Sequence, residues 1–349
     1  MRTSYKKDDV ELLLKDITGL VKPLSTEERE KEIQSGRHYS EMLPLEYVPT
    51  DEYMKVYKEA LNIFAKDTAL AVGNLSDKII RDKGKNIVIV SLARAGIPIG
   101  ILVKRFIKKK YRIDLPHYSI SIIRGKGIDN NAMKYLLDRY LPEQILFLDG
   151  WIGKGAILRE LQSQISNYEG VSSDIAVISD PANVTKLYGT REDILIPSSC
   201  LNSTVSGLVS RTFFRDDIIG ENDFHGAAYY EELKDRDLSY EFIEAIESEF
   251  QYDRDIIEEN KEGSGIEEVL NISKAFEIED INLIKPGIGE TTRVLLRRIP
   301  WKILINKKYK DDLSIKPIIR LATERNVDIV FYDLKNYKCC GIIKKLADA

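Results

Sequence analysis

The sequence predicts an α/β protein with two unequal folded parts. Four short runs rich in β-branched residues alternate with helical stretches, which is the pattern of a mostly parallel sheet. A chain of 349 residues, 43% of them hydrophobic, is also longer than one ordinary core requires, so we expect a second domain. Residues 285–349 hold 15 Lys and Arg against 7 Asp and Glu, whereas the whole chain has a net charge of -4. Such asymmetry favours a tail that binds an anion such as RNA. The alternative is that these basic residues only form a solvated surface.

The first 85 residues are predicted to be an N-terminal helical segment. Ser25 and Glu28 form a capping-box pattern, which marks the start of a helix. Residues 51–83 carry apolar side chains near helical spacing. We interpret residues 36–41, between these helices, as a connector, and a loop over a site is the alternative.

The sheet is predicted to lie in a domain of residues 86–235. Its strands and helices are expected to alternate along the chain. The predicted strands are residues 86–91, 118–123, 145–149 and 175–179, and the predicted helices are residues 96–110, 131–140 and a stretch ending near residue 167.

Residues 236–279 are acidic and are predicted to be a helical connector, interrupted by a Gly-Ser-Gly turn at residues 263–265. A small α/β domain follows at residues 280–349. It is expected to run helix, strand, helix, strand, at residues 290–298, 301–305, 315–325 and 328–332.

Two glycine-rich turns follow strands of the predicted sheet, where open α/β sheets bind ligands. The first comprises Ala93, Arg94, Ala95 and Gly96. The second begins at Asp149 and Gly150 and continues through Gly153, Lys154, Gly155 and Ala156 into a helix. Small residues let backbone N–H groups approach a phosphate, and the two cations add charge. The alternative interpretation is that these glycines form ordinary turns between a strand and a helix and bind no ligand.

This pair of turns resembles type I phosphoribosyltransferases over roughly residues 86–200. The resemblance implies that phosphoribosyl pyrophosphate binds to both turns and that Mg²⁺ is held through the pyrophosphate, with no direct protein ligand. It also implies catalytic roles for Asp149, Lys126 and Arg94. The chain departs from the family pattern at Gly150, where a second carboxylate is usual, and at Lys154, where a hydroxyl residue is usual. Both departures weaken the case for an ordinary nucleotide-salvage enzyme.

A segment dense in small polar residues, 198–227, follows the sheet. We expect Asn202, Ser203 and Thr204 to line the pocket opposite the two turns, together with Arg211. Cys200 and His225 form the alternative nucleophile pair, because a thiolate needs a nearby base. The stretches around His38, Cys200 and His225 are similar to a bacterial family that is found beside tellurite-resistance genes and labelled "cysteine protease StiP".

The basic tail opens with Gly289, Glu290 and Arg293, followed by Arg297 and Arg298. These residues resemble the RNA-contacting turn and helix of Pelota-type domains. The resemblance implies RNA binding through the carboxylate and the basic side chains. Gly289 stands where that family usually has Asn, which is a departure from the pattern for base-specific recognition. Cys339 and Cys340 are interpreted as structural.

The leading functional prediction is therefore a phosphoribosyltransferase that binds RNA through its C-terminal domain. Its acceptor is an unknown base or small molecule. A Cys200/His225 peptidase and a non-catalytic nucleotide sensor controlling RNA binding are the alternatives. The charged N-terminus and the absence of a long apolar run predict a cytoplasmic protein without a membrane partner. A homo-oligomer is left open.

Overall fold

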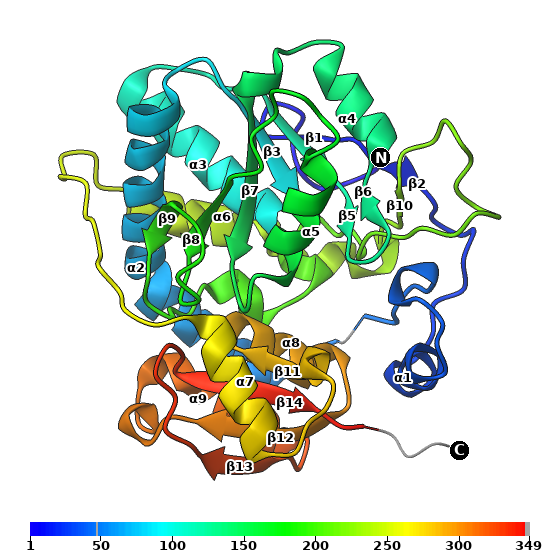
Figure 1. Cartoon of the computed structure of the whole chain (residues 1–349), viewed down its shortest axis with the longest axis vertical. Coiled ribbons are helices and arrows are strands. Elements are labelled where there is room, and N and C mark those ends of the chain that lie inside the picture. The colour runs from blue at the N-terminus through cyan, green and yellow to red at the C-terminus, as the bar shows by residue number, and fades with distance from the viewer. Residues whose placement is uncertain (47, 346–349) are drawn as a thin grey trace.

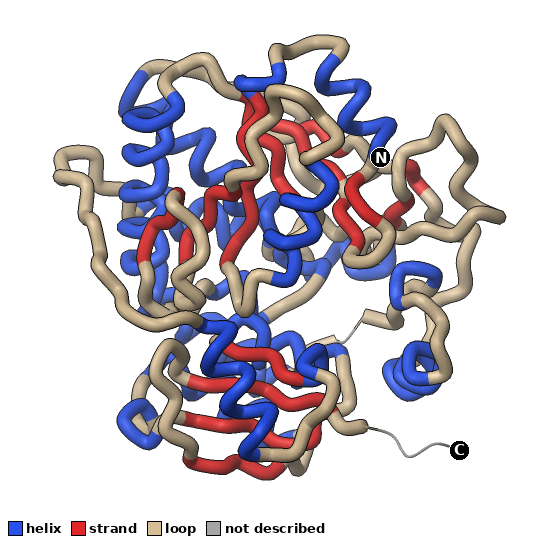
Figure 2. Tube along the Cα trace, viewed as in Figure 1, coloured by secondary structure: helices blue, strands red, loops and turns tan. Residues whose placement is uncertain are grey.

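The computed structural model describes residues 1–46 and 48–345, which form a larger core domain and a smaller C-terminal domain. In Figure 1 the C-terminal domain lies below the core domain, with helix α7 (Gly265–Ala275) across its front. The chain passes between them on the left of the view, after helix α6 (Ser239–Ser248). Figure 2 shows the same arrangement as strands enclosed by helices in each part.

The core domain is built on a six-stranded parallel sheet in the order β1-β4-β3-β7-β8-β9. Parallel strands buried on both faces read as continuous apolar runs, which is why their sequences do not alternate. The strands are β1 (Glu11–Leu12), β4 (His117–Ile120), β3 (Val88–Leu92), β7 (Ile145–Trp151), β8 (Ile175–Ser179) and β9 (Leu187–Thr190).

Helices cover both faces of this sheet. Alternate side chains of each strand point to opposite faces, so Ile89 packs in one hydrophobic cluster and Val90 in another. The first cluster includes residues of α2 (Asp51–Lys83), α3 (Gly96–Tyr111) and α6. The second includes residues of α4 (Asn130–Leu137) and α5 (Ala156–Ile165).

Short strands outside the large sheet fix the loops around it. β5 (Ile122–Ile123) and β6 (Gly127–Ile128) form an antiparallel hairpin. β2 (Lys15–Asp16) pairs in parallel with β10 (Gly226–Ala227). The N-terminal residues are thereby tied to the segment that follows the sheet.

The C-terminal domain contains a four-stranded sheet in the order β11-β14-β12-β13. Its strands are β11 (Ile284–Pro286), β14 (Cys339–Ile343), β12 (Pro300–Ile305) and β13 (Asp328–Phe331). Helices α8 (Ile288–Arg297) and α9 (Lys316–Glu324) contact each other, and α8 also contacts β14. Cys339 and Cys340 are fully buried in β14, as expected of structural cysteines.

The predicted mixed α/β fold and its parallel sheet are confirmed, and strand β8 has the predicted bounds. The prediction of mainly helix over residues 1–85 is incomplete. That segment also contains β1, which joins the sheet beside β4, and only then α1 (Thr26–Gln34) and α2. β1 was missed because two residues of pairing leave no periodic signal. β14 was missed because Cys and Gly residues give little local strand signal.

No helix in the described ranges is both long and apolar enough to cross a bilayer.

A substitution at Gly189 of β9 tests how closely helix α2 packs on this strand. A Cβ atom there would lie 2.4 Å from the carbonyl oxygen of Ala71 in α2 and 2.7 Å from that of Ile178 in β8. Because both obstacles are backbone, we expect Gly189→Ala to lower the free energy of unfolding by about 1–3 kcal/mol. Gly150→Ala is the control, since its Cβ would meet nothing closer than 3.6 Å. Equal denaturation midpoints for the two variants would contradict this packing.

Candidate functional site between the two domains

The turn after strand β7 is the place where the C-terminal domain attaches to the core. The Lys154 ammonium donates to the carbonyl oxygen of Ile281 and, at 3.0 Å, to that of Ile284. The Tyr337 hydroxyl donates to the Gly153 carbonyl at 2.5 Å. A Cβ on Gly153 would come within 2.8 Å of the Glu290 side chain, so glycine permits this approach.

Burial lowers the pKa of Lys154 to about 7. The sequence assigned Lys154 to phosphate binding, but its ammonium is committed to these two carbonyls.

Asp193 makes a second attachment. Its two carboxylate oxygens accept the backbone N–H groups of Ile288, at 3.0 Å, and Lys338, at 2.9 Å. The first of these lies at the N-terminal end of α8, where a carboxylate is electrostatically favoured. Burial nevertheless raises the pKa of Asp193 to about 6. The start of α8 is therefore fixed against the core.

One face of helix α8 is turned toward the core domain along its whole length. Gly289 lies so close to Trp151 that a Cβ there would be 2.2 Å from the indole ring. The Arg293 guanidinium lies 4.4 Å from the centre of the same ring and pairs with Glu290 at 2.8 Å. Arg297 donates to the Asn202 side chain. The residues that resemble an RNA-contacting surface thus point inward, toward the core.

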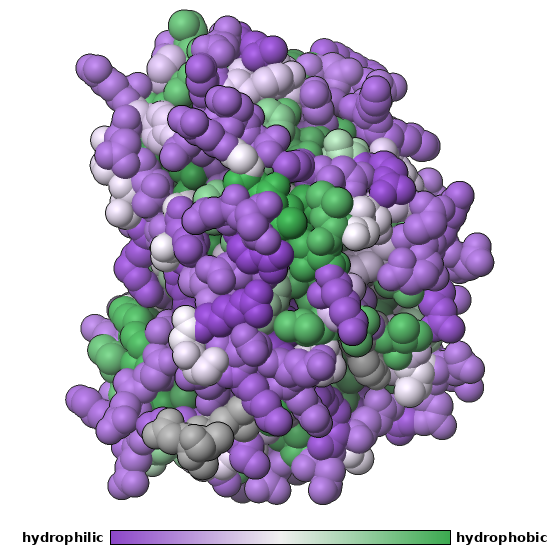
Figure 3. Space-filling model, turned by 90° about the vertical axis from the view of Figure 1, so that its right-hand side faces the viewer, coloured by the Kyte–Doolittle hydropathy of each residue, from purple (hydrophilic) through white to green (hydrophobic). Residues whose placement is uncertain are grey.

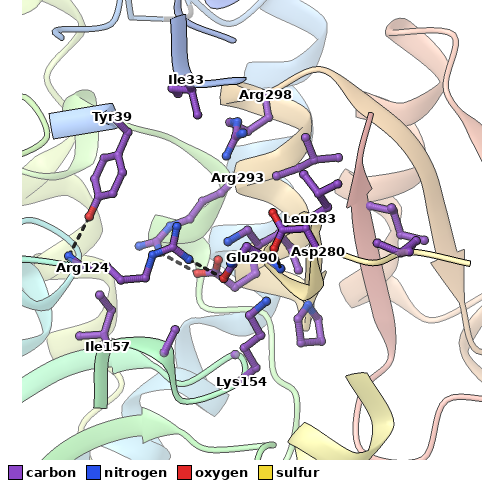
Figure 4. A pocket seen from close by; sticks show the side chains of 18 of the residues that line it. Ile33, Tyr39, Arg124, Lys154, Ile157, Asp280, Leu283, Glu290, Arg293 and Arg298 are labelled. Carbon is purple, nitrogen blue, oxygen red and sulfur yellow. Dashed lines mark hydrogen bonds and ion pairs between the residues drawn. The ribbon is translucent and has the colours of Figure 1, made fainter. Parts of the chain in front are cut away.

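A cavity of about 1690 Å³ lies between the two domains. Its walls come from the β7 turn, the β5–β6 hairpin, the segment before α2, helix α1 and the C-terminal domain. Figure 4 shows Tyr39, Arg124, Arg293 and Arg298 around the space, with Glu290 and Lys154 below. The Arg124 backbone N–H donates to the Tyr39 hydroxyl at 2.9 Å, and the Arg124 carbonyl lies 3.0 Å from Nε2 of the His38 imidazole. Of residues 36–41, which were interpreted as a connector, Tyr39 therefore lines the cavity.

Cationic side chains outnumber carboxylates in the lining of this cavity. Arg298 is paired with Glu30 of α1, and Arg124 donates to Asn282. Within the described chain, the side chains of Arg211 and Lys285 have no hydrogen bond or ion pair, although Arg211 lies 4.5 Å from the centre of the Tyr39 ring. Burial lowers the pKa of Arg211 to about 9 and that of Lys285 to about 8. Such cations are costly without an anion, so the cavity suits a negatively charged ligand.

The three predicted catalytic residues are not arranged as one group. Asp149 lines the cavity, and burial raises its pKa to about 6. Arg94 is buried, where it donates to the Val209 carbonyl at 2.6 Å and pairs with Glu46 at 3.2 Å. Lys126 pairs with Glu41 at 3.7 Å. Of the three, Asp149 alone lines the cavity.

The two predicted substrate loops also differ in their position relative to the cavity. Asp149, Gly153, Lys154, Gly155 and Ala156 line the cavity. The remaining predicted substrate residues do not line it. They are Gly150 of the same turn, Ala93, Arg94, Ala95 and Gly96 of the other loop, and Asn202, Ser203 and Thr204 of the small polar segment.

Asn202 and Ser203 instead bond to Arg297 and Glu46, and with Arg94 they form a polar layer beneath α8. The cavity residues Lys285 and Trp301 were missed, because their sequence surroundings carry no motif. Tyr39 lies in the segment for which a loop over a site was the alternative interpretation.

Cys200 and His225 lie in different surroundings. Cys200 is fully buried, its carbonyl accepts the Tyr53 hydroxyl of α2 at 2.8 Å, and burial raises the pKa of its thiol to about 12. His225 bonds through Nδ1 to Ser121 at 2.9 Å, and its backbone N–H donates to Asp129. No interaction joins Cys200 to His225 in the described part of the chain. The pair is therefore not assembled as a thiolate and base in this conformation.

Two different family models match the chain, one over the core domain and one over the C-terminal domain. Residues 3–247 match the family model described as "Tellurite-like stress resistance cysteine protease StiP", and residues 263–345 match that of the "PELOTA RNA binding domain". A relative from Acinetobacter baylyi, "Cysteine protease StiP", is 34% identical over 98% of this chain and 94% of its own length.

Among solved structures, the chain is similar to a Helicobacter pylori xanthine-guanine-hypoxanthine phosphoribosyltransferase. The similarity covers 41% of this chain and 84% of that chain at 13% identity. Its TM-score of 0.24 is too low to support an argument about fold or function.

These matches contradict the prediction of a phosphoribosyltransferase that uses phosphoribosyl pyrophosphate. The family model and the relative both name a cysteine protease, which was the alternative prediction. The structure supplies a physical reason for the error. Lys154 bonds the C-terminal domain and Arg94 is neutralised by Glu46, so neither cation is free for a pyrophosphate. The Mg²⁺ that accompanied this substrate stays a prediction.

The pKa of Asp193 predicts how stability depends on pH. The pKa of Asp193 in the folded state, about 6, exceeds the ordinary 3.8 of an Asp. Between pH 3.8 and pH 6 the folded state therefore binds more protons than the unfolded state does. Stability should therefore fall by up to about 3 kcal/mol as pH rises from about 4 to 6. Asp193→Asn should remove that part of the pH dependence, which denaturant unfolding at several pH values would measure. An unchanged slope in the variant would contradict the assignment.

Proposed function

The chain belongs to the StiP family of tellurite-like stress resistance proteins, and on this premise we propose that it binds RNA at the cavity between its two domains. The observation that carries the proposal is the inward-facing basic surface of the C-terminal domain. Arg293, Arg298 and Lys285 of that domain line one cavity together with Arg124 and Arg211 of the core. The match to a Pelota RNA-binding domain supports RNA as the anion.

Electrostatics favour a polyanion over a single small anion. Glu290 and Glu30 neutralise Arg293 and Arg298, but Lys285 and Arg211 keep their charge without an ion pair in the described chain. Each phosphate that contacts one of these cations releases counterions from the RNA. Binding should therefore weaken as salt concentration rises.

Removing two cavity cations should weaken RNA binding. We expect Lys285→Met combined with Arg211→Gln to lower the affinity for a short RNA about tenfold or more at physiological salt and to reduce the salt slope by about 1–2. Fluorescence anisotropy against salt concentration measures both quantities. Lys66→Gln is the control, because Lys66 is an exposed cation of α2 outside the cavity. The proposal fails if both proteins bind RNA as the native chain does.

A cysteine protease is the second candidate function, and the sequence of the matched region favours one residue. Cys200 is the single cysteine within residues 3–247, whereas Cys339 and Cys340 lie in the C-terminal domain. If the activity named for the relative extends to this chain, its thiol is that of Cys200. Because this thiol is buried with a raised pKa, the segment around it must open before it can act as a nucleophile.

Two cysteine variants test this second function. We expect Cys200→Ala to lower hydrolysis of an unfolded protein substrate such as casein by more than about a hundredfold. Cys340→Ala removes an equally buried thiol and should leave the rate unchanged, provided that thermal unfolding shows both variants to be folded. Full hydrolysis by folded Cys200→Ala would exclude Cys200 as the nucleophile.

A further inference from the structure

Helix α1 covers the cavity but has little apolar attachment to the rest of the protein. Its sequence, TEEREKEIQ, carries four Glu residues, and the two residues it buries are Arg29 and Glu30. The C-terminal end of the helix lines the cavity. α1 lies on the right of Figure 1, beside the C-terminal domain, and Figure 3 shows that this side of the molecule is largely hydrophilic. Charge therefore holds α1 in place, more than hydrophobic packing does.

The main attachment of α1 is a carboxylate on a cavity arginine. Glu30 is only 1% exposed and accepts two hydrogen bonds from the Arg298 guanidinium, at 2.6 and 2.8 Å. Although burial opposes ionisation, the Arg298 bonds hold the pKa of Glu30 below its usual value. A guanidinium binds carboxylate and phosphate in the same forked geometry. Glu30 thus occupies a position that a phosphate group would fill.

Glu30 does not neutralise the neighbouring cations. Arg29 is 2% exposed, and its Nε atom has no hydrogen-bond partner in the described chain. Both burial and the nearby charge of Arg298 lower the pKa of Arg29. Arg211 and Lys285, which have no ion pair in the described ranges, are electrostatically coupled to Arg298 as well. Phosphate groups in the cavity would give Arg211 and Lys285 the negative charge that one carboxylate on Arg298 does not supply.

Aromatic side chains accompany the cations. Trp301 lines the cavity and is 39% exposed, with Phe276 packed edge-on at 6.4 Å between ring centres. Cations alternating with accessible aromatic faces are typical of sites for single-stranded nucleic acid, because phosphates pair with the cations and bases stack on the rings. An acidic peptide would use the cations but would leave Trp301 without a role.

We propose that the cavity binds a single-stranded segment of RNA, which displaces α1 by replacing Glu30 with a phosphate on Arg298. This inference rests on the proposed RNA binding and names the form of RNA and its place. The volume of about 1690 Å³ exceeds the roughly 300–1,000 Å³ of a pocket for one small ligand. The enclosure by two domains and α1 admits one strand with separated bases, the form of RNA that proteins read most readily.

The test compares RNA affinities of the full-length protein by fluorescence anisotropy. The probes are a labelled eight-nucleotide RNA of mixed sequence and the same RNA annealed to its complement. We expect the single strand to bind at least tenfold more tightly. Glu30→Gln should raise its affinity about three- to tenfold, because the competing charge is lost. Glu27→Gln is the matched control on the same helix, since Glu27 is exposed and has no hydrogen bond or ion pair in the described chain.

A second pair of variants does not depend on α1. Trp301→Ala should weaken single-strand binding about tenfold, as expected for loss of one stacked base. Phe331→Ala should not, because Phe331 is 56% exposed on β13 and lies outside the cavity. Thermal unfolding confirms that each variant is folded.

The outcomes separate this inference from the proposed function. RNA bound equally well as a duplex, and unaffected by Glu30→Gln and Trp301→Ala, would place RNA on another surface and overturn the inference while RNA binding stands. Displacement of the RNA by polyglutamate at equal charge concentration would identify an acidic peptide site and also overturn it. No RNA binding by the native protein or by Glu30→Gln would reject both.

Discussion

The attachment of the C-terminal domain to the carboxyl edge of the parallel sheet determines the rest of this structure. Lys154 of the β7 turn donates to carbonyl oxygens at and just before β11, and the Gly153 carbonyl accepts the Tyr337 hydroxyl from just before β14. Asp193 accepts the first backbone N–H of α8. These contacts use polar groups of both domains that would otherwise be buried without partners. They also fix the orientation of α8, so that its basic residues face the core and enclose a cavity.

The enclosure explains the unusual electrostatics of the junction. Guanidinium and ammonium groups from α8, β11 and the core approach each other at this junction, and burial together with the neighbouring positive charges lowers the pKa of Arg211, Lys285 and Arg297. Glu30 and Glu46 compensate part of this charge. A protein that keeps surplus buried cations sacrifices stability there, and binding of an anion would recover it. The charge arrangement and the Pelota match therefore support the same kind of ligand.

The position of Cys200 separates the two functions considered for this chain. The cysteine lies under α2, on a short helical turn, Pro197–Cys200, which also contacts α8. A nucleophilic role needs an ionised and accessible thiol, and neither condition holds in this conformation. A protease activity at Cys200 would thus require a conformational change around this residue, whereas the proposed RNA binding involves the displacement of α1.

The sequence by itself determined the alternation of strands and helices, the two-part organisation and the basic character of the tail, because these features depend on local composition and periodicity. It also led to the turn at Asp149 and Lys154, since a glycine turn after a buried strand is a local pattern. The use of that turn was decided by tertiary structure alone. Lys154 bonds Ile281 and Ile284, more than a hundred residues away in the chain, and Glu30 meets Arg298 across an even longer separation. Local sequence does not encode such pairings, because they form only when the two domains bring distant segments together.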